Sequence, residues 1–502
     1  KELGPVSRLG AYANGSAAYT AALGFRKGAT EISIASNLQG MALSLPAPLG
    51  KSADSVLPVR FDHTAVRETV VGALPTQDHV SLTVGRLASV VYLRDITGPE
   101  PRVLRGSMAI GLEAGETAPM PDSGVLANIN LATVDIDAWE KVLDGSGAAP
   151  PAATAAVRPG QTAAVLSYLP TTLAIRAREL LFGGRKLNNV VVGGSRDGLN
   201  WRANMDAAEL NGYVEFGQPA SGGAGRVYAR LSRLNLGQSS VREVEAILNE
   251  QPANIPALDI VVEDVELRGK KLGRVEIEAI NRNAATVARE GGVREWRLNK
   301  LNITVPEATL SATGNWVAVN PQQLPAAGGA RGPTERRRTV MNFKLDIADS
   351  GELLKRFGMS DVIRQGKGRM EGQIAWTGSP LNLDSPSLNG QFNINVASGQ
   401  FLKADPGIAK LLGVLSLQAL PRRLTLDFRD VFSEGFSFDF VRGDVNITQG
   451  LAFTNNLQMK GVNAAVLMEG SADIAKETQD LKVVVVPEIN AGTASLIATI
   501  IN

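Results

Sequence analysis

Short stretches in which every second residue is apolar recur along this chain, and turns rich in glycine and asparagine separate them. In one of the clearest, Phe392, Ile394 and Val396 alternate with Asn393 and Asn395. Because successive side chains of a β-strand point to opposite faces, each stretch has one apolar and one polar face. The sequence therefore predicts a mainly β fold, built from a long, curled antiparallel sheet with a few short helices.

The same phase continues through the C-terminal part of the chain, where it defines a set of candidate apolar-face residues. They are Phe392, Ile394, Val396, Leu424, Leu426, Phe428, Phe436, Phe438, Phe440, Val466 and Met468. An apolar face of this extent can fold onto itself as a sandwich, pack on other chains, or line a groove for an apolar ligand. Periodicity alone favours the sandwich. Which face of each strand points inward stays open, because a one-residue slip inverts the assignment.

The charge balance gives no support for nucleic-acid binding, which would need a basic stripe. Lysine and arginine number 51, aspartate and glutamate number 50, and the formal net charge is +1. The one basic cluster, Arg336 to Arg338, precedes a strongly apolar predicted strand. We interpret it as a solvated gatekeeper beside that strand, with contact to phospholipid headgroups as the alternative.

Catalytic and metal-binding chemistry has little support in the sequence. The chain has no cysteine, which excludes disulfides, thiol catalysis and cysteine metal sites. Its two histidines, His63 and His79, each follow an aspartate, but their spacing matches no helical or hairpin template for a metal site. No nucleophile elbow in a strand-turn-helix setting and no P-loop motif is present. We expect no enzyme, no metal and no cofactor.

Composition divides the chain into four segments. Residues 145–161, rich in proline, alanine and glycine, are typical of a linker. The linker separates a β-rich groove segment over residues 1–144 from a second one over residues 162–390. Residues 391–502 form a C-terminal region. No window holds about 18 uninterrupted apolar residues, and the first residues do not resemble a signal peptide. Since the chain opens mid-pattern and stops on an apolar stretch, we expect an excised portion of a longer protein.

Helices are expected to be short and few, serving as plugs or lids on the sheet. The candidates are residues 239–249, 349–357, 406–419 and 490–501. Strands and helices do not alternate regularly, which favours an antiparallel sheet over parallel βαβ units.

Three stretches resemble the YhdP family of Gram-negative bacteria, an AsmA-like group related to TamB. They are residues 398–496, residues 258–282 (LDIVVEDVELRGKKLGRVEIEAINR) and residues 296–316 (WRLNKLNITVPEATLSATGNW). The resemblance places residues 391–502 in the family's AsmA-like C-terminal region. It implies an inner-membrane protein, anchored by an N-terminal helix that is missing here, with a long periplasmic β-rich body that carries phospholipid toward the outer membrane. The family has no catalytic residues to transfer.

The leading hypothesis is a non-enzymatic conduit in which the apolar groove shields phospholipid acyl chains across the periplasm and so supports the outer-membrane barrier. Headgroups would lie at the open edge of the groove. The rival is a structural or assembly factor for outer-membrane proteins that uses exposed sheet edges to bind a partner strand. The expected partners are phospholipid acyl chains and the inner membrane, through the missing anchor, with an outer-membrane or periplasmic protein as a further candidate.

Overall fold

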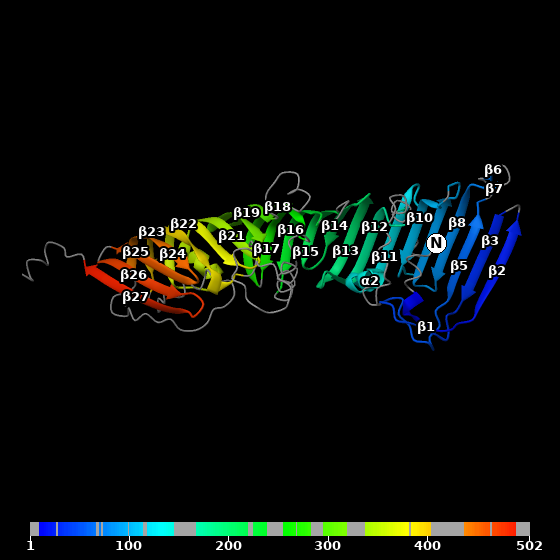
Figure 1. Cartoon of the computed structure of the whole chain (residues 1–502), viewed down its shortest axis with the longest axis horizontal. Coiled ribbons are helices and arrows are strands. Elements are labelled where there is room, and N and C mark those ends of the chain that lie inside the picture. Colours follow the sequence, from blue (N-terminus) through cyan, green and yellow to red (C-terminus); the bar gives the residue numbers. More distant parts are fainter. Residues whose placement is uncertain are drawn as a thin grey trace, which may run out of the picture. The chain divides into compact units, whose positions relative to one another are not determined.

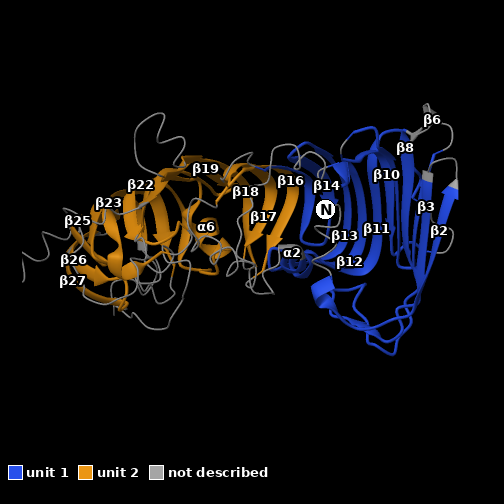
Figure 2. Ribbon diagram, turned by 45° about the vertical axis from the view of Figure 1, so that its right-hand side comes forward, with its two compact units in different colours: residues 1–220 blue, residues 221–502 orange. Residues whose placement is uncertain are grey.

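The computed structural model describes residues 10–26, 29–66, 70–71, 74–98, 100–113, 118–144, 167–218, 224–237, 255–267, 269–282, 295–318, 337–380, 383–402, 436–461 and 464–487. The chain forms two compact units, Lys1–Ala220 and Ser221–Asn502, coloured separately in Figure 2. The predicted linker at residues 145–161 lies outside the described residues, and the three boundaries between the four predicted segments stay predictions.

Unit 1 is built on a ladder of strands that lie side by side in chain order (Figure 1). They are β2 (Tyr19–Arg26), β3 (Ala29–Ser36), β5 (Val59–Ala65), β8 (Gln77–Val84), β9 (Ala88–Asp95), β10 (Arg102–Ile110), β11 (Gly124–Asp135), β12 (Thr172–Phe182), β13 (Arg185–Asp197), β14 (Asn200–Asp206) and β15 (Leu210–Gly217). Two small pairs accompany them, β1 (Ala13–Gly15) with β4 (Met41–Leu43) and β6 (Val70–Val71) with β7 (Leu74–Pro75). The 3-10 turn η1 (Gly10–Tyr12) and helix α2 (Ile136–Asp144) complete the described part.

Unit 2 continues in the same style with longer strands. They are β16 (Arg226–Leu236), β17 (Ala257–Leu267), β18 (Lys270–Arg282), β19 (Glu295–Val305), β20 (Ala308–Ala318), β21 (Arg337–Ile347), β22 (Ile363–Thr377), β23 (Asn389–Phe401), β24 (Phe436–Thr448), β25 (Leu451–Gly461), β26 (Ala464–Asp473) and β27 (Thr478–Pro487). Helix α6 (Ser350–Arg356) and the 3-10 turn η5 (Ser385–Ser387) lie between strands of this ladder. The prediction of a mainly β fold is therefore confirmed.

The antiparallel prediction holds for most neighbours but not for three pairs. Strands β10 and β11, β11 and β12, and β16 and β17 run parallel. Parallel neighbours need a connection that returns the chain to the same end of the sheet, whereas antiparallel neighbours can be joined by a tight turn. Each of the three pairs is indeed separated by a long connection, at residues 111–123, 136–171 and 237–256.

One predicted helix is confirmed and one helix was missed. Residues 349–357 contain α6, and Asp349 caps it by accepting hydrogen bonds from the backbone N–H groups of Gly351 and Glu352 at 2.9 and 3.1 Å. The missed helix, α2, directly follows β11, in a stretch for which the sequence analysis expects no helix. Asp135 accepts a hydrogen bond from the backbone N–H of Ala138 at 2.8 Å, as an N-cap residue does. The other three predicted helices lie outside the described residues.

Candidate functional site

The strand register aligns one residue from every described strand of unit 2 in a continuous row that contains no charged side chain. Following the paired positions from β16 to β27, the row contains Val227, Leu258, Ala279, Leu298, Gly314, Met341, Ile374, Gly390, Ile447, Ala452, Ala472 and Gln479. We call the face that carries this row the uncharged face of unit 2.

Two further rows on the same face are equally free of charge. One runs from Ala229 through Ile260, Ile277, Leu301, Ala312, Phe343, Gly372 and Phe392 to Val445. The other runs from Val305 through Ala308, Ile347, Gly368, Val396, Val441, Met459 and Val466 to Val485. The face is thus free of charge both along and across these strands.

The opposite face of the same strands carries the charges. A row one residue away from Phe343 and Phe392 contains Lys344, Glu371, Asn393 and Asp444. On this face Arg369 pairs with Asp346 at 2.7 Å, and the hydrogen bond from Lys300 holds the pKa of Glu276 below its usual value. Each strand therefore separates its side chains by charge.

Local irregularities keep the uncharged face in phase where the sequence does not alternate strictly. Leu298 and Leu301 are three residues apart, an odd spacing that would place them on opposite faces of a regular strand. The register with β20 shifts between them, so both face the same side. A similar shift joins Val262 and Val265 of β17. Such bulges insert one extra residue into a strand and thereby restore the apolar phase.

Most of the predicted residues in the described part of the chain lie on this face. Phe392, Val396, Phe438, Val466 and Met468 are buried, and Ile394 packs beside them. Phe436 belongs to β24 opposite Phe401. The predicted positions Leu424, Leu426 and Phe428 lie outside the described residues.

Phe440 does not follow the predicted phase. Its register partners are the exposed Ala397 and Lys460, and the guanidinium carbon of Arg442 lies 4.2 Å from the centre of its ring. Val441, its neighbour in sequence, packs against the buried cluster instead. The register of β24 with β25 shifts between Phe438 and Phe440, so the bulge turns Phe440 to the charged face.

The buried side chains of the uncharged face pack into clusters. One joins Val396, Phe401, Phe438, Met459 and Val466, with the Phe401 and Phe438 rings 5.2 Å apart. A second is centred on Phe392 and Trp376. An open groove along this face stays a prediction.

In unit 1 an apolar face is exposed at β2, the first described strand of the ladder. Tyr19, Leu23 and Phe25 of β2 have exposed fractions of 72%, 65% and 81%. The register places Ile34 of β3 and Leu82 of β8 on the same face, and both are also exposed. These five large apolar side chains form what we call the β2 patch. Contiguous exposed apolar surface of this kind marks binding sites more often than single exposed residues do.

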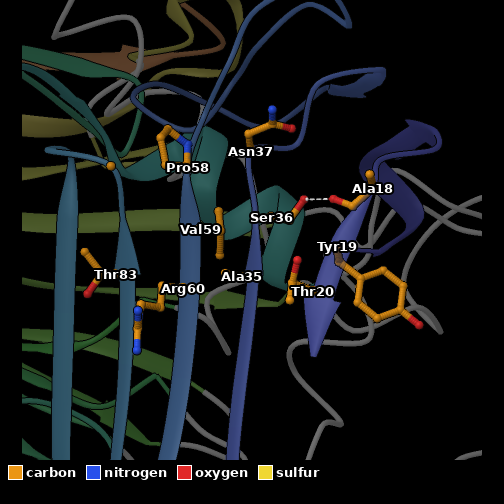
Figure 3. Close-up of a pocket in the computed structure, with 11 residues that line it drawn as sticks. Ala18, Tyr19, Thr20, Ala35, Ser36, Asn37, Pro58, Val59, Arg60 and Thr83 are labelled. Carbon is orange, nitrogen blue, oxygen red and sulfur yellow. Dashed lines mark hydrogen bonds between the residues drawn. The ribbon is translucent and has the colours of Figure 1, made fainter. Parts of the chain in front are cut away.

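A depression of about 490 Å³ lies at the ends of β2, β3, β5 and β8 (Figure 3). Its lining is mixed, with Tyr19, Val59 and Pro58 beside Ser36, Asn37 and Arg60. Ser36 donates a hydrogen bond to the carbonyl oxygen of Ala18 at 2.7 Å, while the ring of Tyr19 points away from the other lining residues. Because Tyr19 lines it, the depression adjoins the β2 patch.

The two histidines belong to no cluster of three metal-ligating side chains among the described residues. His63 instead contacts the buried carboxylate of Asp78 at 2.8 Å. Arg94 donates two hydrogen bonds to the same carboxylate, at 2.9 and 2.6 Å, and a third to the hydroxyl of Tyr168 at 3.1 Å. Burial opposes the charge on Arg94, but these bonds outweigh it and raise its pKa. These contacts form a structural hydrogen-bond network at one end of the sheet, and we call its residues His63, Asp78 and Arg94 the clasp.

The described residues contain no helix that is long and apolar enough to cross a membrane. Fold and site together define a mainly β protein whose strands separate charged from uncharged side chains over whole rows. Comparison with protein-family profiles matches residues 4–502 to the family described as "YhdP protein". The chain therefore belongs to the YhdP family, and the resemblance seen in the sequence is confirmed.

One characterised relative is the "Intermembrane phospholipid transporter YhdP" of Escherichia coli (strain K12), which is 30% identical over 202 residues. The match covers 40% of this chain and 16% of the E. coli protein. No solved structure matches the chain.

Proposed function

We propose that this chain forms part of a lipid-transfer protein that moves phospholipid between two membranes, with the acyl chains lying against its uncharged faces. The relative from E. coli is named for intermembrane phospholipid transport, which supports the proposal in general terms. The observation that carries it here is the β2 patch, where Tyr19, Leu23 and Phe25 leave large apolar side chains uncovered on one face.

The energetics favour such a surface. Burying one methylene group gains about 0.8 kcal/mol, so a 16-carbon chain costs on the order of 13 kcal/mol to hold in water. A continuous apolar surface removes most of this barrier. A single charge on the path would restore a few kcal/mol of it, as it does within a bilayer. The uncharged rows of unit 2 meet this requirement.

In the proposed setting the protein is held at the inner membrane of a Gram-negative bacterium, with its β-rich body in the periplasm. No catalytic step is involved. Sheet curvature would close the uncharged face into a groove, and the lipid would slide along it.

Lipid extraction of the purified chain followed by mass spectrometry tests the proposal. Stoichiometric phospholipid is the expected result. Absence of phospholipid, together with retention of the fold by circular dichroism, would contradict it.

The rival function, strand addition during outer-membrane protein assembly, is favoured by one observation. β27, the last strand of the ladder, exposes Val484 and Val486 on the face opposite to Val483. A peptide that added to the edge of this strand through main-chain hydrogen bonds could place its own apolar side chains beside Val484 and Val486. A chain without lipid that binds an extended peptide through β27 would support this rival.

A further inference from the structure

A row of tryptophans borders the uncharged face of unit 2 at one end of its strands. Trp296 of β19 lies directly opposite Trp316 of β20, Trp316 lies opposite Thr339 of β21, and Thr339 lies opposite Trp376 of β22. Asn281 of β18 extends the row on its other side. Three indoles thus follow one another across four strands, at the boundary between the apolar rows and the strand ends.

Indoles gather at such boundaries for a physical reason. An indole combines a large apolar body with one N–H donor, so it suits a boundary where its body is buried, as all three are here, and its N–H can reach a polar group at the strand ends. The Nε1 of Trp376 donates to the carbonyl oxygen of Ser379 at 2.9 Å, and that of Trp296 to Pro256 at 3.3 Å. The Nε1 of Trp316 is buried and has no hydrogen-bond partner among the described residues.

A cavity of about 430 Å³ adjoins this row at Trp376. Its other lining residues are mostly polar and include Arg338, Thr377, Ser387, Asn389 and Gln449. Several of the polar groups already bond one another. The backbone N–H of Thr377 donates to the hydroxyl of Ser387, and that of Gln449 donates to the side-chain oxygen of Asn389. The cavity is thus held in shape by its own hydrogen bonds.

Arg338 is the one charged residue in the lining of this cavity. It is exposed, and it forms no ion pair with any carboxylate in the described part of the chain. The guanidinium carbon of its neighbour Arg337 lies 5.2 Å from the centre of the Trp316 ring. The cavity therefore presents positive charge beside an aromatic boundary, which suits a phosphate group flanked by apolar chains.

The opposite ends of the same strands are organised differently. There α6 covers the strand ends, and its basic residues are paired: Lys355 with Glu352 at 3.3 Å, and Arg356 with Glu307. The side-chain hydrogen bond between the latter two lowers the pKa of Glu307 and raises that of Arg356. These paired charges leave little net attraction for an anion.

We propose that the cavity at Trp376 and Arg338 binds the phosphate headgroup of a glycerophospholipid, while the tryptophan row marks the level at which its acyl chains enter the uncharged face. This inference rests on the proposed function and adds the position of the headgroups. They lie at the Trp376 end of the strands, and the α6 end is closed to them. Arg338 and Thr377 alternate with Thr339 and Trp376, so they lie on the charged face at the strand ends. From the cavity an acyl chain would pass around the end of β22 at Trp376 and reach Ile374, which begins the uncharged rows of β22.

Photo-crosslinking of the full chain with two phospholipid probes tests the inference. One probe carries a diazirine on the headgroup and the other carries it at the end of an acyl chain, and labelled peptides are located by mass spectrometry. The headgroup probe is expected to label residues 337–340 and 376–389. The acyl probe is expected to label strand positions of the uncharged face, such as Phe343 and Phe392.

Two charge reversals provide a matched comparison. Arg338→Glu should reduce headgroup labelling at the cavity about tenfold, the cost of losing a charged hydrogen bond. Arg338→Lys should retain most of it. Arg364→Glu is the control, because Arg364 is an exposed arginine at the opposite end of β22. It should leave headgroup labelling unchanged.

The outcomes separate the two proposals. Headgroup labelling at residues 350–367, or equal effects of Arg338→Glu and Arg364→Glu, would overturn the headgroup site while acyl labelling of the uncharged face still supports lipid binding. If the acyl probe labels no residue of the uncharged face, the proposed function itself fails, and the headgroup site fails with it.

Discussion

Gly372 of β22 lies directly opposite Phe392 of β23, and a Cβ atom added at Gly372 would fall 2.5 Å from the Cβ of Phe392. On its other side the register places Phe343 of β21 opposite the same glycine. Two phenylalanines of the uncharged face thus flank a position that has no side chain. The absence of a Cβ lets the neighbouring strands approach and lets the large rings fill the space above the glycine.

The first prediction concerns this glycine. Gly372→Ala should destabilise unit 2 by about 1–3 kcal/mol, because the new methyl group meets backbone and Cβ atoms that cannot rotate away. Gly193→Ala is the matched control in a strand of unit 1, where an added Cβ would meet nothing within 4 Å. Urea-induced unfolding of both variants measures the difference. Equal unfolding midpoints would contradict the steric argument.

The alternation at Phe392, Ile394 and Val396 was sufficient to predict the uncharged face of β23, because this strand is regular through those positions. Phe440 was assigned to the wrong face, because a bulge depends on pairing with β25 and leaves no clear mark in the sequence of β24. Asp78 was noticed as a neighbour of His79, yet it pairs with His63. The sequence did contain an indication of this pairing. Asp78 lies on the same strand face as Val80 and Leu82, and a carboxylate on an apolar face needs a buried partner.

The second prediction tests the need for an uncharged path. Val466 and Phe438 are only 2% and 3% exposed, so an aspartate at either position should destabilise the fold as well as block lipid. The β2 patch offers a cleaner test. Leu23→Asp should lower phospholipid binding and transfer between vesicles, with a stability change within about 0.5 kcal/mol, since Leu23 is largely exposed.

Ala22→Asp is the control for this experiment, because Ala22 is exposed on the opposite face of β2. It adds the same charge one residue away. If both variants transfer lipid as well as the unmodified chain does, the β2 patch does not lie on the lipid path.

The third prediction concerns the clasp formed by His63, Asp78 and Arg94. Asp78→Asn should destabilise unit 1 by about 3–5 kcal/mol, because it leaves the guanidinium of Arg94 buried without its carboxylate. Combining it with Arg94→Met should cost less than the sum of the two single changes, since the double variant has no unpaired charge. A double-mutant cycle from urea unfolding measures this coupling, and strict additivity would show that the pair contributes nothing.

The last prediction concerns alkaline pH and Tyr92. Burial, with a further contribution from Tyr168, raises the pKa of Tyr92 to about 12, above its usual value of 10.0. A group whose pKa is higher in the folded state stabilises the fold fully below the unfolded value and loses this effect as the pH rises through the folded value. Unit 1 should therefore lose stability between about pH 10 and 12.

Tyr92 also donates a hydrogen bond to the carbonyl oxygen of Tyr168 at 3.0 Å, so Tyr92→Phe should be less stable at neutral pH yet show a flatter dependence of stability on pH in this window. Unfolding midpoints measured from pH 9 to 12 distinguish the two chains, and parallel profiles would mean that Tyr92 does not titrate with unfolding.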